Sequence, residues 1–252
     1  MTLKEFFTEH PKAAVALSGG VDSSYLFYSA CVSGADVRAY FVDSAFQPTR
    51  EKQDAERIAA DIGVPDRLTI LHADVLAYDE ITANPENRCY YCKKQVFGLI
   101  AARARHDGYS VILDGTNASD DQSDRPGMKA LQELNVYSPL LICGLTKEDI
   151  RARSHDAGLF TWNKPSYACL ATRIPHGEEI NDEKLRRICS AEEELRAMGF
   201  SDLRVRKRGE TGLIQLPAEQ FAKAVSEHAV ISKKLSKYFE TLALDLRPRK
   251  SN

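Results

Sequence analysis

The chain has 252 residues, of which 43% are hydrophobic and 28% charged, and these proportions exclude a disordered or fibrous protein. Its 34 basic and 36 acidic residues leave a net charge of −2, which gives no overall field to hold nucleic acid or an anionic membrane. No apolar run approaches the roughly 18 residues of a membrane span, and the start MTLKEFFTEH lacks the apolar core of a signal peptide. We therefore expect a cytoplasmic protein with no membrane or nucleic-acid partner.

The first half of the chain alternates short β-rich runs with longer helical patterns. Pro48 precedes and Gly63 follows one of these helical patterns, which is the usual punctuation of a helix. This alternation predicts an α/β fold, a doubly wound parallel sheet covered on both faces. The helix over 22–33 is apolar on nearly every side and should lie deep against that sheet. Strands are expected at 12–17, 36–42, 67–71 and 110–114, and helices at 22–33, 49–62 and around 96–104.

The second half begins with a helix whose first residues, Thr146 and Asp149, stand in capping-box positions. From 163 to 177 the periodicity stops, and a loop of that length inside a compact domain is usually functional or disordered. Beyond it, one helical face, two short strands near 203–206 and 213–216, a helical stretch and a final apolar run at 242–246 predict a smaller α+β domain. The predicted divisions are a nucleotide domain at 1–162, an active-site loop at 163–177 and a substrate domain at 178–252.

The segment SGGVDSS follows the first predicted strand and opens the first helix, where backbone amides can hold phosphate. Gly19 and Gly20 allow a sharp turn and a close approach to an oxyanion. No Gly-Lys-Ser/Thr follows, so the segment is no Walker A loop, and the missing lysine favours a released pyrophosphate over transfer of a terminal phosphoryl group. We expect the nucleotide and its Mg²⁺ to contact Ser18, Gly19, Gly20, Asp22, Ser23 and Ser24.

Six cysteines are too sparse for a disulfide scaffold in a chain of this length. Cys89 and Cys92 form a CxxC pair at an expected helix start, with both sulfurs toward one side. The pair could hold a metal ion such as zinc, form a redox disulfide or simply pack. Cys169 lies in the irregular loop near Lys164 and Arg173, and such cations lower the pKa of a thiol, as a nucleophile requires. Core packing is expected for Cys31, Cys143 and Cys189.

The SGGVDSS segment resembles the pyrophosphate loop of the N-type ATP pyrophosphatases, which share the adenine nucleotide α-hydrolase fold. Their members use ATP to adenylate a carbonyl or carboxylate oxygen. The DGTN segment, expected at the carboxyl end of a strand, resembles a second element of that group. The resemblance implies that this segment lies near the ribose and the adenylated substrate. The resemblance implies nucleotide contacts at Asp43, Asp114, Gly115, Thr116 and Asn117.

Two further blocks, NRCYYCK at 87–93 and KPSYACLATRIP at 164–175, resemble the LarE sulfur transferases. The likeness extends over essentially the whole chain. It implies that ATP adenylates a carboxylate of pyridinium-3,5-dicarboxylate mononucleotide and that sulfur then replaces oxygen, giving the thiocarboxylate of the nickel-pincer nucleotide. Members with the CxxC pair are expected to bind iron–sulfur, so a 4Fe–4S cluster at Cys89, Cys92 and Cys169 would carry an external sulfide. In sacrificial members the cysteine at position 169 would itself donate the sulfur.

Arg204, Arg206 and Arg208 alternate along a predicted strand, so their side chains share one face. That face suits phosphate or carboxylates, although a solvated strand face is the alternative. The resemblance implies substrate contacts at Arg173, Arg204 and Arg206, while Gln215 stands where an acidic residue is expected. An amide ligase of the NAD synthetase type and a tRNA thiolase are the competing functions. We also expect a homo-oligomer.

Overall fold

The computed structural model describes residues 1–120 and 125–249, which form two compact units. The first unit comprises Met1–Val75 and Asn87–Lys164, and the second comprises Leu76–Glu86 and Pro165–Asn252. The structure therefore divides the chain after Lys164 and assigns an early segment, Leu76–Glu86, to the second unit, which the sequence pattern did not indicate. Within the described residues no helix is long and apolar enough to cross a membrane.

A five-stranded parallel sheet forms the centre of the first unit, in the order β3-β2-β1-β4-β5, and the predicted α/β class is confirmed. Its last strand was not predicted, because a run of two residues carries no alternating pattern. The fourth strand is shorter than expected for the same region. The strands are β1 Lys12–Ala16, β2 Asp36–Asp43, β3 Leu68–His72, β4 Ile112–Leu113 and β5 Val136–Tyr137.

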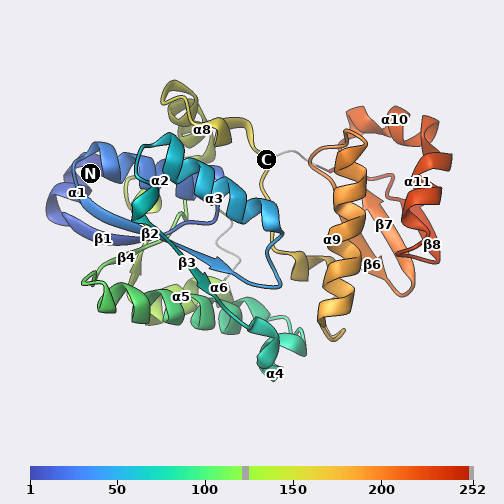
Figure 1. The fold of residues 1–252 in the computed structure, drawn as a ribbon, viewed down its shortest axis with the longest axis horizontal. Coiled ribbons are helices and arrows are strands. Elements are labelled where there is room, and N and C mark those ends of the chain that lie inside the picture. The colour runs from blue at the N-terminus through green and yellow to red at the C-terminus, as the bar shows by residue number, and fades with distance from the viewer. Residues whose placement is uncertain (121–124, 250–252) are drawn as a thin grey trace. The chain divides into compact units, whose positions relative to one another are not determined.

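Helices cover both faces of this sheet, as Figure 1 shows. Successive side chains of a strand point to opposite faces, so Ala13 and Val15 join the core under α1, α2 and α3, whereas Ala14 joins the core under α5 and α6. Both faces are thus buried, as a parallel sheet requires. The helices are α1 Leu3–Glu9, α2 Val21–Val32, α3 Thr49–Asp61, α5 Arg88–His106, α6 Arg125–Glu133, α7 Pro139–Ile142 and α8 Lys147–Asp156, with 3-10 turns at Pro65–Arg67, Val75–Ala77 and Phe160–Asn163.

Two helices illustrate how local sequence sets this layer. In α2, Leu26, Phe27 and Ala30 are fully buried, which confirms the prediction from its apolar surface. The start of α8 has the predicted capping box, because the Thr146 side chain accepts from the Asp149 amide and the Asp149 side chain accepts from the Thr146 amide. Such caps satisfy backbone donors that the first helical turn leaves unpaired.

The second unit contains a three-stranded sheet in the order β6-β7-β8, antiparallel at the first pair and parallel at the second. The buried side chain of Asn84 explains why an early segment belongs to this unit. Its amide donates to the carbonyls of Ile174, Pro175 and Glu178. The elements are α4 Asp79–Thr82, η4 Leu170–Arg173, α9 Asp182–Ala197, β6 Arg204–Arg208, β7 Thr211–Gln215, η5 Ala218–Gln220, α10 Phe221–Ser226, α11 His228–Leu235 and β8 Thr241–Leu244.

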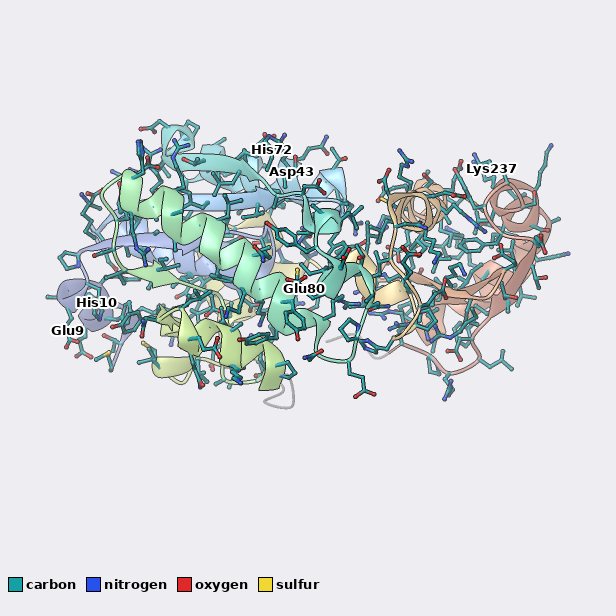
Figure 2. The ribbon with its side chains drawn as sticks, turned by 90° about the horizontal axis from the view of Figure 1, so that it is seen from below. Glu9, His10, Asp43, His72, Glu80 and Lys237 are labelled. Carbon is teal, nitrogen blue, oxygen red and sulfur yellow. The ribbon has the colours of Figure 1, made fainter. Side chains whose placement is uncertain are left out.

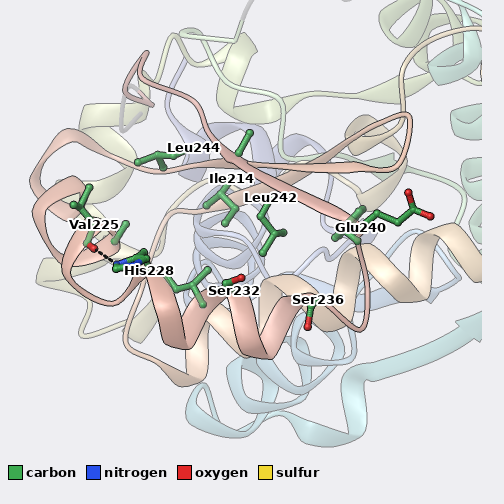
Figure 3. Close-up of a pocket in the computed structure, with 12 residues that line it drawn as sticks. Ile214, Val225, His228, Ser232, Ser236, Glu240, Leu242 and Leu244 are labelled. Carbon is green, nitrogen blue, oxygen red and sulfur yellow. Dashed lines mark hydrogen bonds between the residues drawn. The ribbon is translucent and has the colours of Figure 1, made fainter.

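An apolar cavity of about 400 Å³ lies between the last two helices of this unit and its sheet (Figure 3). Ile214, Leu242 and Leu244 line it, with His228 and Ser232 on the helix side. Paired residues of neighbouring strands share a face, and Arg206 is paired with Leu213, the neighbour of Ile214. The cavity therefore opens on the opposite face of the sheet from Arg206.

Candidate active site

The phosphate loop lies between β1 and α2, where Gly20 is the N-cap of the helix. Gly19 has φ +75°, and a Cβ atom there would lie 2.6 Å from the backbone oxygen of Glu51. Position 19 therefore requires glycine for two reasons: the positive φ disfavours other residues, and a side chain would collide with the Glu51 backbone oxygen. At Gly20 the nearest atom to such a Cβ is the Ser18 hydroxyl at 3.4 Å, which is ordinary contact. The loop presents helix N-terminal amides, the usual partners of a phosphate.

Serine hydroxyls fix the shape of this loop. The Ser18 amide donates to the Ser23 hydroxyl over 3.1 Å, and the two hydroxyl oxygens are 3.0 Å apart. The Ser23 hydroxyl also donates to the Gly20 carbonyl over 3.3 Å. Ser24 is fully buried, and its hydroxyl is among the buried side-chain atoms of the described chain that have no hydrogen-bond partner. Two of the predicted serines thus shape the loop.

The DGTN segment lies directly against this loop. A Cβ atom at Gly115 would be 2.9 Å from the Ser23 amide nitrogen, so only glycine permits the approach. The buried Asp114 accepts hydrogen bonds from the hydroxyls of Thr116 and Ser138, and burial raises its pKa. Ser138 was not predicted as part of the site, since it precedes a four-residue helix far along the chain. The structure brings both predicted nucleotide segments together within the first unit.

A lysine missing from the loop sequence is supplied by α8. Lys147, the first residue of that helix, donates to the carboxylate of Asp22. Burial raises the pKa of Asp22, while Lys147 opposes the rise. Its other carboxylate oxygen, Oδ1, has no hydrogen-bond partner in the part of the chain that the structure describes. Sequence reasoning missed Lys147 because 125 positions separate it from Asp22.

A second lysine, Lys164, contacts the outer side of the same loop. Its ammonium group donates to the Gly19 carbonyl over 2.9 Å and to the Glu51 carboxylate over 3.0 Å. It also donates to Asp54. Sequence reasoning placed Lys164 near Cys169 as a cation acting on the thiol, whereas its contacts here are with the phosphate loop and α3.

Asp43, predicted to contact the nucleotide, lies at the carboxyl end of β2. Its carboxylate is 3.6 Å from the ammonium group of Lys52 and 3.6 Å from the ring of His72, the last residue of the neighbouring strand (Figure 2). This is the strand end where open α/β sheets bind ligands. The nucleotide role of Asp43 stays a prediction.

The cysteine pair lies in the first two turns of α5, which begins at Arg88, one residue before Cys89. Cys89 and Cys92 are partly exposed and about one helical turn apart, and thiols are the donors that iron–sulfur clusters use. Both belong to the first unit, whereas Cys169 belongs to the second. Among the described residues no group of three or more Cys, His, Asp or Glu side chains is placed to hold a metal ion. The three-cysteine cluster therefore stays a prediction.

Cys169 is partly exposed and is the N-cap of η4 in the second unit. Arg173, four residues on, is fully buried and forms an ion pair with Glu192 of α9 at 2.9 Å. Its Nη1 donates to the carbonyls of Ala168 and Cys169. Arg173 was expected to contact the substrate. In the structure its guanidinium group donates hydrogen bonds to protein atoms, and the substrate contact stays a prediction.

Arg204 and Arg206 lie on β6, as predicted, and both reach the loop that carries Cys169. Arg204 is buried, and burial lowers its pKa to about 10, so it remains charged at neutral pH. Arg206 Nε donates to Gln215 Oε1 over 2.7 Å. The Gln215 amide in turn donates to the Asp245 carboxylate over 2.8 Å. The position where an acid was expected thus holds an amide that links Arg206 to an acid on another segment.

The parallel sheet with its glycine-rich strand–loop–helix and the adjoining DGTN segment defines the first unit as a nucleotide-binding domain of the ATP pyrophosphatase class. A family model described as asparagine synthase matches residues 7–120. The chain is 38% identical to an uncharacterized protein of Synechocystis over 89% of this chain and 84% of that protein. It is 27% identical to a tRNA-specific 2-thiouridylase of Fervidobacterium nodosum, over 61% of this chain and 54% of that protein.

A further relative extends over nearly the full length. The pyridinium-3,5-bisthiocarboxylic acid mononucleotide synthase of Lactiplantibacillus plantarum is 30% identical over 97% of this chain and 89% of that protein. The chain belongs to this family, the LarE sulfur transferases, and is an ATP-dependent enzyme.

Proposed function

We propose that this enzyme uses ATP to convert a carboxylate of pyridinium-3,5-dicarboxylate mononucleotide into a thiocarboxylate, as the name of its relative from Lactiplantibacillus describes. The observation that carries the proposal is the packing of DGTN against SGGVDSS through Gly115, at the carboxyl ends of the parallel strands. Such an edge binds the ligands of open α/β sheets. A nucleotide there would have its phosphates at the amides that open α2 and its ribose near Asp114.

The first step would be adenylation. A carboxylate oxygen of the substrate attacks the α-phosphorus of ATP, and the bond to pyrophosphate breaks as that group leaves with the electron pair. Negative charge accumulates on the leaving group, where preorganised donors stabilise it most. Gly19, Gly20 and the start of α2 would supply amides, Lys147 a positive charge, and Asp22 a carboxylate oxygen for the nucleotide's Mg²⁺.

The second step would be sulfur transfer from Cys169. Its thiolate forms an S–C bond to the activated carbonyl carbon, and the C–O bond to AMP breaks. A base then removes the Cα proton of Cys169 as the Cβ–S bond breaks, which leaves a thiocarboxylate and dehydroalanine at position 169. A 4Fe–4S cluster bound by Cys89, Cys92 and Cys169 would instead supply sulfide from an external source, so that the protein is not consumed.

The substrate's phosphate or carboxylate groups would bind at Arg204 and Arg206. Planar guanidinium groups match such anions in pairs of hydrogen bonds. Both arginines belong to the unit that holds Cys169, and each donates a hydrogen bond to a backbone carbonyl of the Cys169 loop. Binding and sulfur donation are thereby assigned to the second unit, and ATP activation to the first.

The proposal is tested with protein purified without oxygen, mixed with Mg-ATP and pyridinium-3,5-dicarboxylate mononucleotide. We expect pyrophosphate release and a thiocarboxylate product. Cys169→Ala should keep pyrophosphate release and lose the thiocarboxylate product. Cys143 is a partly buried thiol that packs against the core under α1, α2 and α3, so Cys143→Ala should keep both pyrophosphate release and the product. Absence of substrate-dependent pyrophosphate release from the wild type contradicts the function.

The same samples identify the source of sulfur. Loss of about 34 Da, one H₂S, from Cys169 after a single turnover shows that the cysteine is consumed. A brown protein after anaerobic reconstitution, whose colour disappears when any of Cys89, Cys92 and Cys169 is changed to Ala, shows the cluster. In that case the mass of the polypeptide stays unchanged through turnover.

A further inference from the structure

The backbone of the loop around Cys169 is held by arginines on both sides of the cysteine. Arg173 Nη1 donates to the carbonyls of Ala168 over 2.8 Å and of Cys169 over 3.2 Å. Arg204 donates to the carbonyl of Ser166, and Arg206 donates to that of Thr172. Four carbonyls within seven residues thus accept hydrogen bonds from guanidinium groups, and the Cys169 carbonyl also accepts from the Thr172 amide of η4 over 3.1 Å.

One buried carboxylate, that of Glu192 on α9, anchors this arrangement. Arg173 Nε donates to Glu192 Oε1 over 2.9 Å, and Arg173 Nη2 donates to Oε2 over 3.4 Å. The same carboxylate accepts from the Val205 amide over 3.1 Å and from the Tyr167 hydroxyl over 3.0 Å. Burial opposes ionisation of Glu192, but the charges of Arg173 and Arg196 and the hydrogen bonds that the carboxylate accepts together outweigh burial and lower the pKa of this carboxyl.

The ring of Tyr167, two residues before Cys169, provides a second contact for the same cations. The guanidinium carbon of Arg173 is 4.7 Å from the ring centroid, and that of Arg204 is 5.1 Å away. Cations at such distances are attracted to the negative face of an aromatic ring. The two arginines are therefore fixed by the ring of Tyr167 as well as by their hydrogen bonds.

A buried ion pair is a costly way to stabilise a fold. Replacing such a pair with neutral residues of similar volume is often neutral or stabilising, because both charges lose their hydration on burial. Arg173 is 0% exposed and Glu192 is 1% exposed, so both have lost their contact with solvent. What the pair does supply is a rigid, directional set of donors that holds the two peptide groups flanking the Cys169 side chain.

We propose that Arg173 and Glu192 are positioning residues that hold Cys169 in the geometry needed for attack on the adenylated carboxylate. This inference rests on the proposed function, since it assigns a role relative to sulfur transfer. It replaces the expected substrate contact of Arg173, because Nε, Nη1 and Nη2 of its guanidinium all donate to protein atoms. The substrate-binding assignment is then confined to Arg204 and Arg206.

The test compares Arg173→Met/Glu192→Gln with the wild type. The double variant removes both charges together. The glutamine amide can accept from the Val205 amide through its oxygen and donate to the Tyr167 hydroxyl oxygen through its nitrogen, so the variant is designed to fold. The control is Glu194→Gln on the same helix, where the partly buried carboxylate pairs with Lys234 and Lys237. Three quantities are measured: substrate-dependent pyrophosphate release, thiocarboxylate formation, and the pH profile of Cys169 alkylation by iodoacetamide, read by peptide mass spectrometry.

In the double variant we expect pyrophosphate release to stay within a factor of about two while thiocarboxylate formation falls about 100-fold, the size of effect that a misplaced reacting group produces. The pH at which Cys169 alkylation is half-maximal should shift. The Glu194→Gln control should match the wild type in pyrophosphate release, thiocarboxylate formation and the pH profile of alkylation. Unchanged thiocarboxylate formation, or an equal fall in both activities, overturns the inference. Failure of the proposed function itself is distinguishable, since the wild type would then make no thiocarboxylate while the alkylation comparison still reports on the loop.

Discussion

The candidate sites of the two units are held in shape by different kinds of interaction. In the first, the phosphate loop is shaped by backbone conformation and neutral hydroxyls, and the nearby charges of Lys147 and Lys164 come from other elements. In the second, the loop around Cys169 has no regular period and is fixed by buried charges, above all Arg173 and Glu192. A phosphate-binding loop must present backbone amides and exclude side chains, so its function depends on a few residues that are adjacent in the sequence. A nucleophile held in an irregular loop depends on partners from elsewhere in the chain.

This difference predicts where each unit tolerates change. The first site should fail when a backbone conformation is altered, and the second when a charge is removed. Each of the following experiments tests one side of that contrast.

The largest effect is expected from Gly19→Ala. The new Cβ would lie 2.6 Å from the Glu51 backbone oxygen in a residue with φ +75°, a conformation that costs a residue other than glycine about 1–3 kcal/mol. Pyrophosphate release should fall at least 100-fold, as expected when reacting groups are displaced. Gly20→Ala is the matched control, because its nearest contact is a side-chain oxygen at 3.4 Å. Equal losses in the two variants would show that backbone shape is not the governing feature.

A smaller loss is expected from Lys147→Ala. Removing one preorganised charge from a leaving group typically costs about 100-fold in rate, and Lys147→Arg should recover part of it. The control is Lys129→Ala, which removes a 70% exposed side chain paired with Glu133. Pyrophosphate release at saturating ATP reports the effect. If Lys147→Ala retains full activity, the positive charge beside Asp22 does not serve the phosphates.

A third effect should appear in substrate binding. Arg206→Ala should raise the substrate concentration needed for half-maximal rate about tenfold, the loss expected for a hydrogen bond to a charged group. The apparent affinity for ATP should stay unchanged. Arg208→Ala, an exposed position on the same strand, is the control. A parallel change in ATP affinity would contradict the assignment of Arg206 to the substrate.

The smallest effect concerns pH and has opposite signs in the two units. The pKa of Glu192 is lowered, so its contribution to stability is present above 4.5 and is lost as pH falls below that value. Burial raises the pKa of Asp114, so the folded first unit binds its proton more readily, and this contribution grows as pH falls. Hydrogen exchange, corrected for intrinsic rates, should show α9 losing protection on acidification before α2 does. Glu192→Gln should remove that sensitivity from α9.

Much of the first unit could be predicted because its signals are local. The strand–loop–helix at SGGVDSS, the caps of α8 and the buried surface of α2 each depend on residues within one or two turns of one another. The two-residue strand β5 could not be predicted, since two residues show no period. The nine-residue helix α6 was not predicted either. In the second unit the strand that carries Arg204 and Arg206, observed as β6, was also predicted.

What the sequence by itself determined is therefore the parallel fold, the phosphate loop and the cysteine in the irregular loop, because conformation and periodicity are properties of neighbouring residues. Only the tertiary structure decided that Lys147 reaches Asp22, that Ser138 holds Asp114 and that Arg173 pairs with Glu192. It also decided that Asn84 joins an early segment to the second unit. These contacts join residues 19 to 125 positions apart, and such partners are selected by packing of the whole chain rather than by any local pattern.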